Sequence, residues 1–199
     1  MPERTAPAKT LDLPGHSAPA VGFEVPLEML AACHSRVQAQ CATLRRLAAH
    51  LARQGADRQA QDAAAAVMRY FDTSAVHHHA DEEVDLFPAL IESMAGSDAV
   101  CLRELTASLA AEHRELERRW RALRRRLEQV TRADAVTLPD DEVHDFIDLY
   151  ERHIAREEAE LLPMAGRLLS DAELDRIGQA MCARRGVLEP TGLPNSSPA

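Results

Sequence analysis

Four long segments of this chain carry apolar residues in alternating steps of three and four, which is the spacing of one face of an α-helix. Helices with such a face pack nearly parallel to one another in bundles. Aromatic residues make up only 4% of the chain, and Ala, Leu, Arg and Glu dominate, so the pattern predicts an all-α bundle. Gly55 and the stretches 95–97 and 135–139 separate the segments. The predicted helices are residues 25–53, 57–94, 98–131 and 139–168.

A shorter fifth helix is expected to begin at Ser170, whose hydroxyl can cap the first turn while Glu173 completes a capping box. Residues 1–22 and 186–199 are rich in Pro, Ala, Ser and Gly, a composition that favours disordered extensions. We therefore expect one folded domain at residues 23–185 between two disordered ends, within the usual size range of single domains.

The formal net charge of −9 argues against binding to nucleic acids or to anionic membranes. The arginine-rich run from Arg114 to Arg126 is interleaved with apolar residues at helical spacing, so its arginines fall mostly on a solvated face. No apolar run approaches the length that spans a bilayer, and the N-terminus lacks the apolar core of a secretory signal. A cytoplasmic location is expected, with no identified protein partner.

Histidines occupy core positions in the first and third predicted helices. His34 and His113 each stand where the apolar stripe calls for a buried residue, so each of these helices points one histidine inward. The first stripe is Leu30, His34, Val37, Cys41, Leu44, Ala48 and Leu51. The third stripe is Leu105, Leu109, His113, Leu116, Trp120, Leu123, Leu127 and Val130.

The second and fourth predicted helices contain an internal repeat with an offset of 75 residues. Each inward stripe ends in a histidine followed one turn later by a glutamate. Val67, Phe71 and Ser74 precede the first pair, and Phe146 and Tyr150 precede the second. His78, Glu82, Glu83, Leu86 and Pro88 match His153, Glu157, Glu158, Leu161 and Pro163.

The run HHHADEE contains three pairs of a histidine and an acid one turn apart. Only the pair His78 and Glu82 fits both the repeat and the apolar stripe. His77 and His79 should point about 100° to either side, as exposed histidines or as neighbours that support a ligand.

Six inward polar groups would cost several kcal/mol each if they were left unpaired in a bundle core. A metal ion compensates them best, and imidazole with carboxylate suits iron, manganese or zinc. Four histidines and two bridging glutamates divide naturally between two ions. Such a pair keeps an open position, which dioxygen, nitric oxide or peroxide needs in order to bind.

At these residues the chain resembles the hemerythrin-like, or HHE cation-binding, family over about residues 26–168. The motifs are one histidine on the first helix, HHADEEVDLFP on the second, Glu112-His113 on the third and HIAREEAELLP on the fourth. The resemblance implies an antiparallel up-down-up-down four-helix bundle and a non-haem di-iron centre with an oxo or hydroxo bridge. The ligands that it implies are His34, His78, Glu82, His113, His153 and Glu157.

The chain departs from the oxygen-carrying hemerythrins of marine invertebrates, which have a fifth histidine on the third helix. One turn either side of His113 stand Leu109 and Glu117, so the centre resembles variants with four histidines and two glutamates. Glu117 is left open as a further oxygen ligand. A ferritin-like oxidase is disfavoured because that class uses Glu-x-x-His, whereas here each histidine precedes its glutamate by four.

These observations lead to one function hypothesis and two alternatives. The first is a protein that binds or senses a diatomic ligand such as dioxygen or nitric oxide, or that handles iron. An alternative is a di-iron enzyme of oxidative or nitrosative stress, with iron–sulfur repair, peroxidase or ferroxidase activity, although repair factors of this kind have an extra N-terminal cysteine-containing domain and this chain has no cysteine before Cys33. The third hypothesis is a metal-free bundle that acts through protein interactions. Trp120 and Tyr150 are candidates for the wall of a ligand pocket or for plain core residues.

Overall fold

The computed structural model describes residues 22–94, 98–134 and 137–187, and every regular element in these residues is helical. The expected all-α class is therefore confirmed. The expected disordered extensions, residues 1–22 and 186–199, lie outside the described residues apart from Gly22, Gly186 and Val187. In chain order, the elements are α1 (Pro26–Gln54), α2 (Arg58–Ala80), η1 (Asp81–Leu86), α3 (Phe87–Ser93), α4 (Asp98–Thr131), α5 (Asp140–Arg156), η2 (Glu157–Leu161), α6 (Leu162–Leu168) and α7 (Asp171–Arg184).

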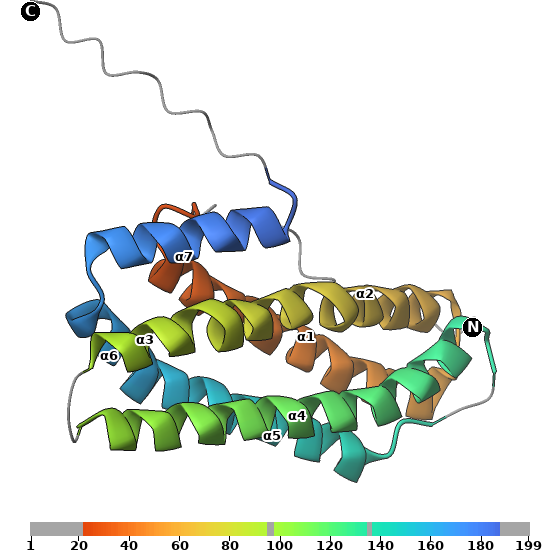
Figure 1. Ribbon diagram of the computed structural model, residues 1–199. Helices are drawn as coiled ribbons and strands as arrows, with labels where there is room; N and C mark the ends of the chain where they lie inside the picture. Colours follow the sequence, from red (N-terminus) through yellow and green to blue (C-terminus); the bar gives the residue numbers. More distant parts are fainter. Residues whose placement is uncertain (1–21, 95–97, 135–136, 188–199) are drawn as a thin grey trace, which may run out of the picture.

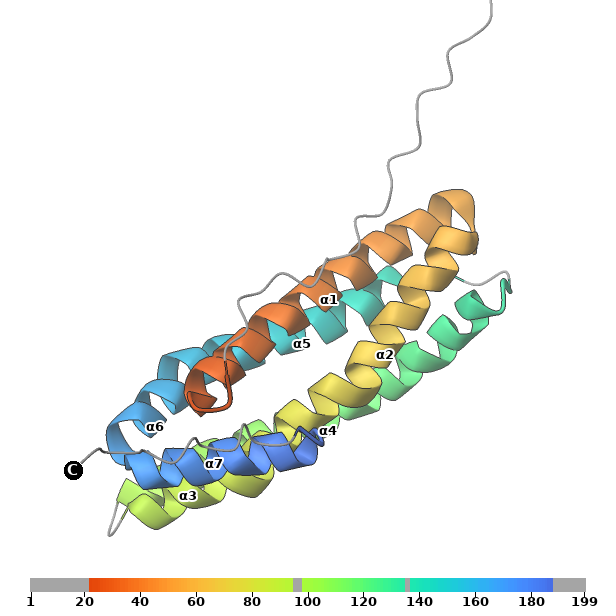
Figure 2. The same ribbon diagram turned by 90° about the horizontal axis from the view of Figure 1, so that it is seen from above.

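The long helices form a bundle in which each one has two main neighbours. α1 packs against α2 and α5, and α4 packs against the same two helices. Consecutive long helices run in opposite directions (Figure 1). α7 contacts α1 and η1, and Figure 2 shows it along one half of the bundle, away from the end where α1 meets α2. Among the described helices, none is both long enough and apolar enough to cross a membrane.

The predicted helices 57–94 and 139–168 are each interrupted by a wider π-helical turn, which the sequence analysis did not foresee. In η1 the N–H of Phe87 donates to the carbonyl of Glu82, five residues back. Pro88 follows immediately; a proline has no N–H to donate, and its ring clashes with the carbonyl four residues earlier in a regular α-helix. A π turn relieves that conflict, and such turns are frequent at functional sites. The second half repeats the device with Leu162, Glu157 and Pro163.

Helix caps set the ends of two elements. The side chain of Asp57 accepts a hydrogen bond from the backbone N–H of Ala60 at the start of α2. Ser170 and Glu173 form both bonds of the predicted capping box at the start of α7, so that prediction is confirmed. In α7, a side chain in place of Gly178 would collide with the backbone oxygen of Phe23, so a glycine is required for this close approach.

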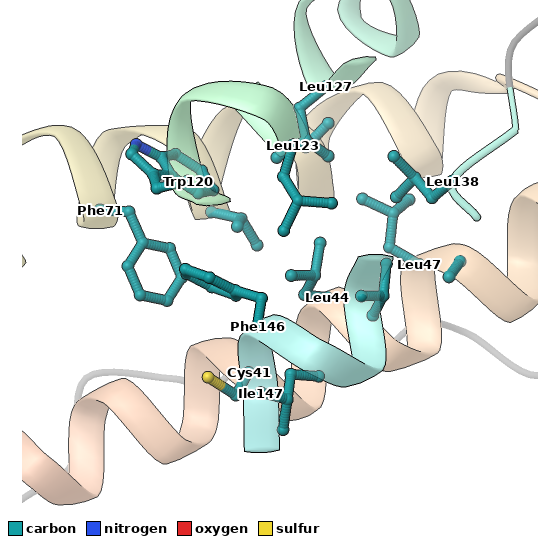
Figure 3. Packing of buried hydrophobic residues seen from close by; sticks show 14 of the residues in the cluster. Cys41, Leu44, Leu47, Phe71, Trp120, Leu123, Leu127, Leu138, Phe146 and Ile147 are labelled. Carbon is teal, nitrogen blue, oxygen red and sulfur yellow. The ribbon is translucent and has the colours of Figure 1, made fainter. Parts of the chain in front are cut away.

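Within the part of the chain that the structure describes, the apolar core forms two clusters, and the predicted ligands lie between them. The first cluster fills the half of the bundle where α1 meets α2 (Figure 3), and it includes Leu44, Phe71, Trp120, Leu123 and Phe146. The second cluster lies at the other end of the bundle, where α3, α6 and α7 contribute to it. It includes Leu30, Leu86, Leu90, Leu109 and Leu161. On α4, His113 stands between Leu109 of the second cluster and Leu116 of the first.

Candidate metal centre

The structure brings the six predicted ligands together at the boundary between the two apolar clusters. α1 contributes His34, α4 contributes His113, and each half of the repeat contributes a histidine at the end of an α-helix and a glutamate in the following π turn. All six side chains are buried. Their role as ligands stays a prediction, but their convergence follows from helical stripes that meet in one layer of the bundle.

The six residues form two groups that share both carboxylates. His34 and His78 make one group with Glu82 and Glu157, and His113 and His153 make the other with the same two glutamates. Within each group one ligand atom from every residue lies within 4.8 Å of the others. Two groups with common carboxylates are the arrangement expected of two neighbouring ions bridged by glutamates.

The inner histidine nitrogens lie close to the oxygens of the two shared glutamates, but these contacts do not have the geometry of hydrogen bonds. Nε2 of His34 lies 3.1 Å from Oε2 of Glu157, and Nε2 of His153 lies 3.1 Å from Oε1 of the same residue. Nε2 of His113 lies 3.3 Å from Oε2 of Glu82. Even so, all four oxygens of the two glutamates are buried and have no hydrogen-bond partner.

Buried carboxylate oxygens without partners are costly, because their charge has lost its hydration. Cations satisfy such oxygens together with imidazole lone pairs. Nε2 of His113 and Nε2 of His153 face each other at 2.9 Å, close to the roughly 3 Å between neighbouring ligands on one ion when each bond is about 2.1 Å long. The residues present therefore fit a pair of metal ions.

Three further glutamates hold the histidines from outside. A carboxylate that accepts a hydrogen bond from Nδ1 fixes the tautomer and turns Nε2 inward as a ligand. The three pairs are His34 with Glu158 at 3.1 Å, His113 with Glu83 at 2.7 Å and His153 with Glu112 at 2.8 Å. Arg156 in turn donates to both Glu112 and Ser108.

Sequence reasoning noted these three glutamates in the motifs but gave them no role. Glu83 and Glu158 follow the two bridging glutamates directly, and Glu112 precedes His113. Each repeat has two consecutive glutamates, and the second cannot point inward when the first one does. This doubling was the available signal that the second glutamate has a role outside the ligand set. The pairing of Glu112 with His153, on another helix, needed the fold.

The pKa values of the centre are shifted because carboxylates and imidazoles are buried against one another. Burial and the nearby charge of Glu157 raise the pKa of Glu82 to about 7. At Glu157 burial alone would raise the pKa. Contacts with His113, His153 and His34 outweigh burial and lower the pKa of this carboxyl group. The pKa of His113 rises to about 11 in spite of its burial, because Glu157, Glu82 and Glu83 surround it. Burial lowers the pKa of His78 to about 3, and the charge of His34 adds to this.

The residues left open by the sequence analysis fall in different places. The ring of His79 lies flat against that of His113, with 4.0 Å between centroids. His77 joins none of the candidate ligand groups that the described residues form. Glu117 is 58% exposed and pairs with Arg121, so the option that it supplies an oxygen ligand is not supported.

Three other expectations concerned the stripes and the pocket wall. Ser74, expected to face inward, is exposed, and Ala75 takes the buried position instead. Trp120 belongs to the first apolar cluster and donates from Nε1 to Asp72. Tyr150 is buried in the same cluster, and its ring lies 6.2 Å from that of His79. Trp120 is therefore a core residue, whereas Tyr150 lines both the core and the edge of the centre.

Comparison with known proteins gives the same picture as the geometry. The family model described as hemerythrin HHE cation binding domain matches residues 25–165. A protein of Haemophilus influenzae, described only as an uncharacterized protein, is 35% identical over 164 residues, which cover 82% of this chain and 92% of the relative. The chain belongs to the hemerythrin HHE cation-binding domain family.

Proposed function

We propose that this protein binds two non-haem iron ions in the centre and uses them to bind or sense a small diatomic ligand, dioxygen or nitric oxide, or to handle iron. The observation that carries the proposal is the pair of ligand groups that share Glu82 and Glu157. Both carboxylates are fully buried, and none of their oxygens has a hydrogen-bond partner. Two cations bridged by these carboxylates would satisfy all four oxygens at once.

The ligand count favours a reactive pair over a purely structural site. Each ion would take two imidazole nitrogens and one oxygen from each shared glutamate, which is fewer ligands than the roughly six that iron accepts. When bound, an iron pair of this kind supplies an open coordination position for a small ligand. The choice of iron rests on the family to which the chain belongs, because the same donors also suit manganese and zinc.

The chain's own residues prepare this position before any ligand arrives. Glu83, Glu112 and Glu158 hold the outward nitrogens of three histidines, so the inward nitrogens point into the centre and are the ones that would give up their protons to metal ions. The apolar clusters on both sides limit the access of water and favour an uncharged diatomic ligand over ions or large substrates. A cytoplasmic location and the lack of nucleic-acid and membrane partners stay predictions of the sequence.

Metal analysis of the full chain purified without added metal tests the proposal, together with optical spectra before and after exposure to oxygen and to nitric oxide. We expect about two irons per chain and a charge-transfer absorption that responds to at least one of the gases. His78→Ala should lower the metal content, whereas the neighbouring variant His77→Ala should leave it unchanged. Zinc or no metal, together with no response to gas, would reject the di-iron function.

A further inference from the structure

A line of aromatic rings leads from the centre toward the outside of the bundle. The ring of His79 lies flat against that of the predicted ligand His113, with 4.0 Å between centroids. The ring of Tyr150 lies 6.2 Å from that of His79, and two phenylalanines join Tyr150 to Trp120. Rings whose centroids are no more than about 7 Å apart are in direct contact. The line of contacts from the predicted ligand to Trp120 is therefore unbroken.

Two parallel routes join Tyr150 to Trp120. Through Phe71 the centroid distances are 5.6 Å to Tyr150 and 4.8 Å to Trp120. Through Phe146 the corresponding distances are 5.1 Å and 6.0 Å. Figure 3 shows the two phenylalanine rings next to Trp120. Because both routes meet at Tyr150, this residue is the point at which the line can be interrupted.

Trp120 ends the line beside a carboxylate that water reaches. Its Nε1–H donates to Oδ1 of Asp72 at 2.9 Å, and Nε of Arg124 donates to both oxygens of the same carboxylate. The side chain of Asp72 is 30% exposed. An indole that loses one electron becomes acidic at its N–H, and a base that accepts a proton must lie within hydrogen-bond reach. Asp72 is therefore placed to take this proton.

The other half of the bundle shows that the core does not need such a line. The chain has one tryptophan, two tyrosines and four phenylalanines. Trp120, Phe71, Phe146 and both tyrosines gather in the first apolar cluster. Among the described residues, the second cluster is filled mostly by leucines, with Phe87 and Phe23 as its aromatic members. Packing alone thus gives no reason for the rings to gather between the centre and Asp72.

We propose that these rings conduct single electrons from the centre to a strong one-electron oxidant, such as an organic radical, that meets the protein at Trp120. All six predicted ligands are buried, so an oxidant of this size does not touch the ions itself. The inference rests on the proposed function, because it requires iron in the centre. It adds a further activity, in which the centre responds to oxidants that are too large to enter it.

The electron and the proton both return to their starting groups on the protein. The oxidant takes one electron from the indole of Trp120, and the Nε1 proton moves to Asp72. The indole then regains an electron from the ferrous centre by way of Tyr150, and Asp72 gives the proton back. In the balance, the oxidant is reduced by one electron, one ferrous ion becomes ferric, and no bond of the protein has changed.

Flash photolysis of the full chain without oxygen tests the path, with photogenerated ruthenium(III) tris-bipyridine as the oxidant. The chain contains a single tryptophan, so the absorbance of the indole radical reports on Trp120 alone. We expect this radical to decay faster in the chain loaded with ferrous iron than in the metal-free chain, while ferric iron forms at the same rate. Zinc has no redox chemistry, so the zinc-loaded chain should lack the acceleration.

Tyr150→Leu interrupts both routes, and Tyr70→Leu is the matched control. Tyr70 also contacts Phe71, at 5.4 Å, but among the ring contacts of the described residues it touches no other ring. After titration has shown that both variants bind iron, the acceleration should be lost in Tyr150→Leu and kept in Tyr70→Leu. Unchanged acceleration in Tyr150→Leu, or the same loss in both variants, would overturn the proposal.

The comparison of iron with zinc needs no variant, so it decides the proposal even where a variant does not fold. Equal decay of the indole radical in the iron-loaded and zinc-loaded chains would reject the electron path and leave the proposed function standing. A chain that bound no iron would reject both. Trp120→Phe completes the test, because without the indole the oxidant should no longer produce ferric iron at the rate seen in the unchanged chain.

Discussion

The two halves of the internal repeat, residues 78–88 and 153–163, share one backbone device and differ in what surrounds it. In both halves a histidine lies in the last turn of an α-helix, a glutamate lies in a π turn and a proline follows. Where the first half has His79 and Asp81, the second has Ile154 and Arg156. The shared positions place the ligands, whereas the other positions decide which part of the fold supports each half.

The supports of the two halves come from different helices. Asp81 in the first half is fully buried and accepts hydrogen bonds from Arg184 and Arg185 at the end of α7. Arg156 in the second half is instead the donor, and it binds Glu112 on α4. The first half therefore holds a buried negative charge next to Glu82 that only α7 compensates among the described contacts, while the second half relies on a pair that is partly open to solvent.

The largest effect is expected for the shared carboxylates, where the two halves should behave alike. Glu82→Gln and Glu157→Gln keep the shape of the side chain but cannot bridge two cations. Both ligand groups contain both residues, so each variant should weaken both ions by more than the roughly 100-fold that changes around a ligand cause. Titration with ferrous iron measures this. Loss of only one ion in either variant would show that its carboxylate serves a single ion.

A surface glutamate in the second half serves as the control for this pair. Glu160 is 55% exposed, and its nearest charged partner is Arg156 at 3.9 Å. Glu160→Gln removes the same charge as the two test variants without touching the centre. It should therefore bind both ions as the unchanged chain does.

The second prediction concerns the stability of the metal-free chain. Replacing both Arg184 and Arg185 with alanine leaves Asp81 buried and unpaired, which should lower the free energy of unfolding by about 3 kcal/mol. Arg156→Ala breaks a partly exposed pair and should cost about 1 kcal/mol or less. Urea-induced unfolding, followed by circular dichroism, compares the two. Equal losses would show that α7 does not support the first half in the way inferred here.

Much of the site was predictable because its residues obey the helical period. His34 and His113 interrupt apolar stripes in register, and the spacing of His78 and Glu82 recurs 75 residues later. A polar residue that keeps the period of a buried face must be buried with it. Local spacing thus predicted which side chains meet, since all six lie in stripes that the bundle turns inward.

The parts that sequence reasoning missed depend on choices that local spacing leaves open. From Phe71 to His78 the steps of three and four can pass through Ser74 or through Ala75, and the structure uses Ala75. Pro88 lies within the predicted helix 57–94, and the helical period alone did not show that a π turn would precede it. The contact between Asp81 and Arg184 joins residues 103 positions apart, and no local pattern encodes such a contact.

The third prediction concerns Glu112, which orients a ligand of the second half. Its carboxylate accepts from Nδ1 of His153 at 2.8 Å and is itself held by Arg156. In Glu112→Gln the amide can present its NH₂ group instead of an acceptor, so the tautomer of His153 is no longer fixed. Affinity for one ion should fall by about 10-fold to 100-fold. Titration with ferrous iron measures the affinity for each ion, and unchanged affinities for both ions would contradict the prediction.

The smallest effects are expected for Glu83→Gln and Glu158→Gln, the equivalent outer glutamates of the two halves. Glu83 lies 2.7 Å from Nδ1 of His113 and is 38% exposed, whereas Glu158 lies 3.1 Å from Nδ1 of His34 and is 48% exposed. A shorter contact with less water around it orients its histidine more firmly. Glu83→Gln should therefore weaken iron binding by about tenfold, the lower end of the usual range, and Glu158→Gln by less. A larger effect of Glu158→Gln would contradict this order. It would show that the ion at His34 and His78 depends more on its outer carboxylate, since Nδ1 of His78 has no hydrogen-bond partner and only His34 is oriented in this way.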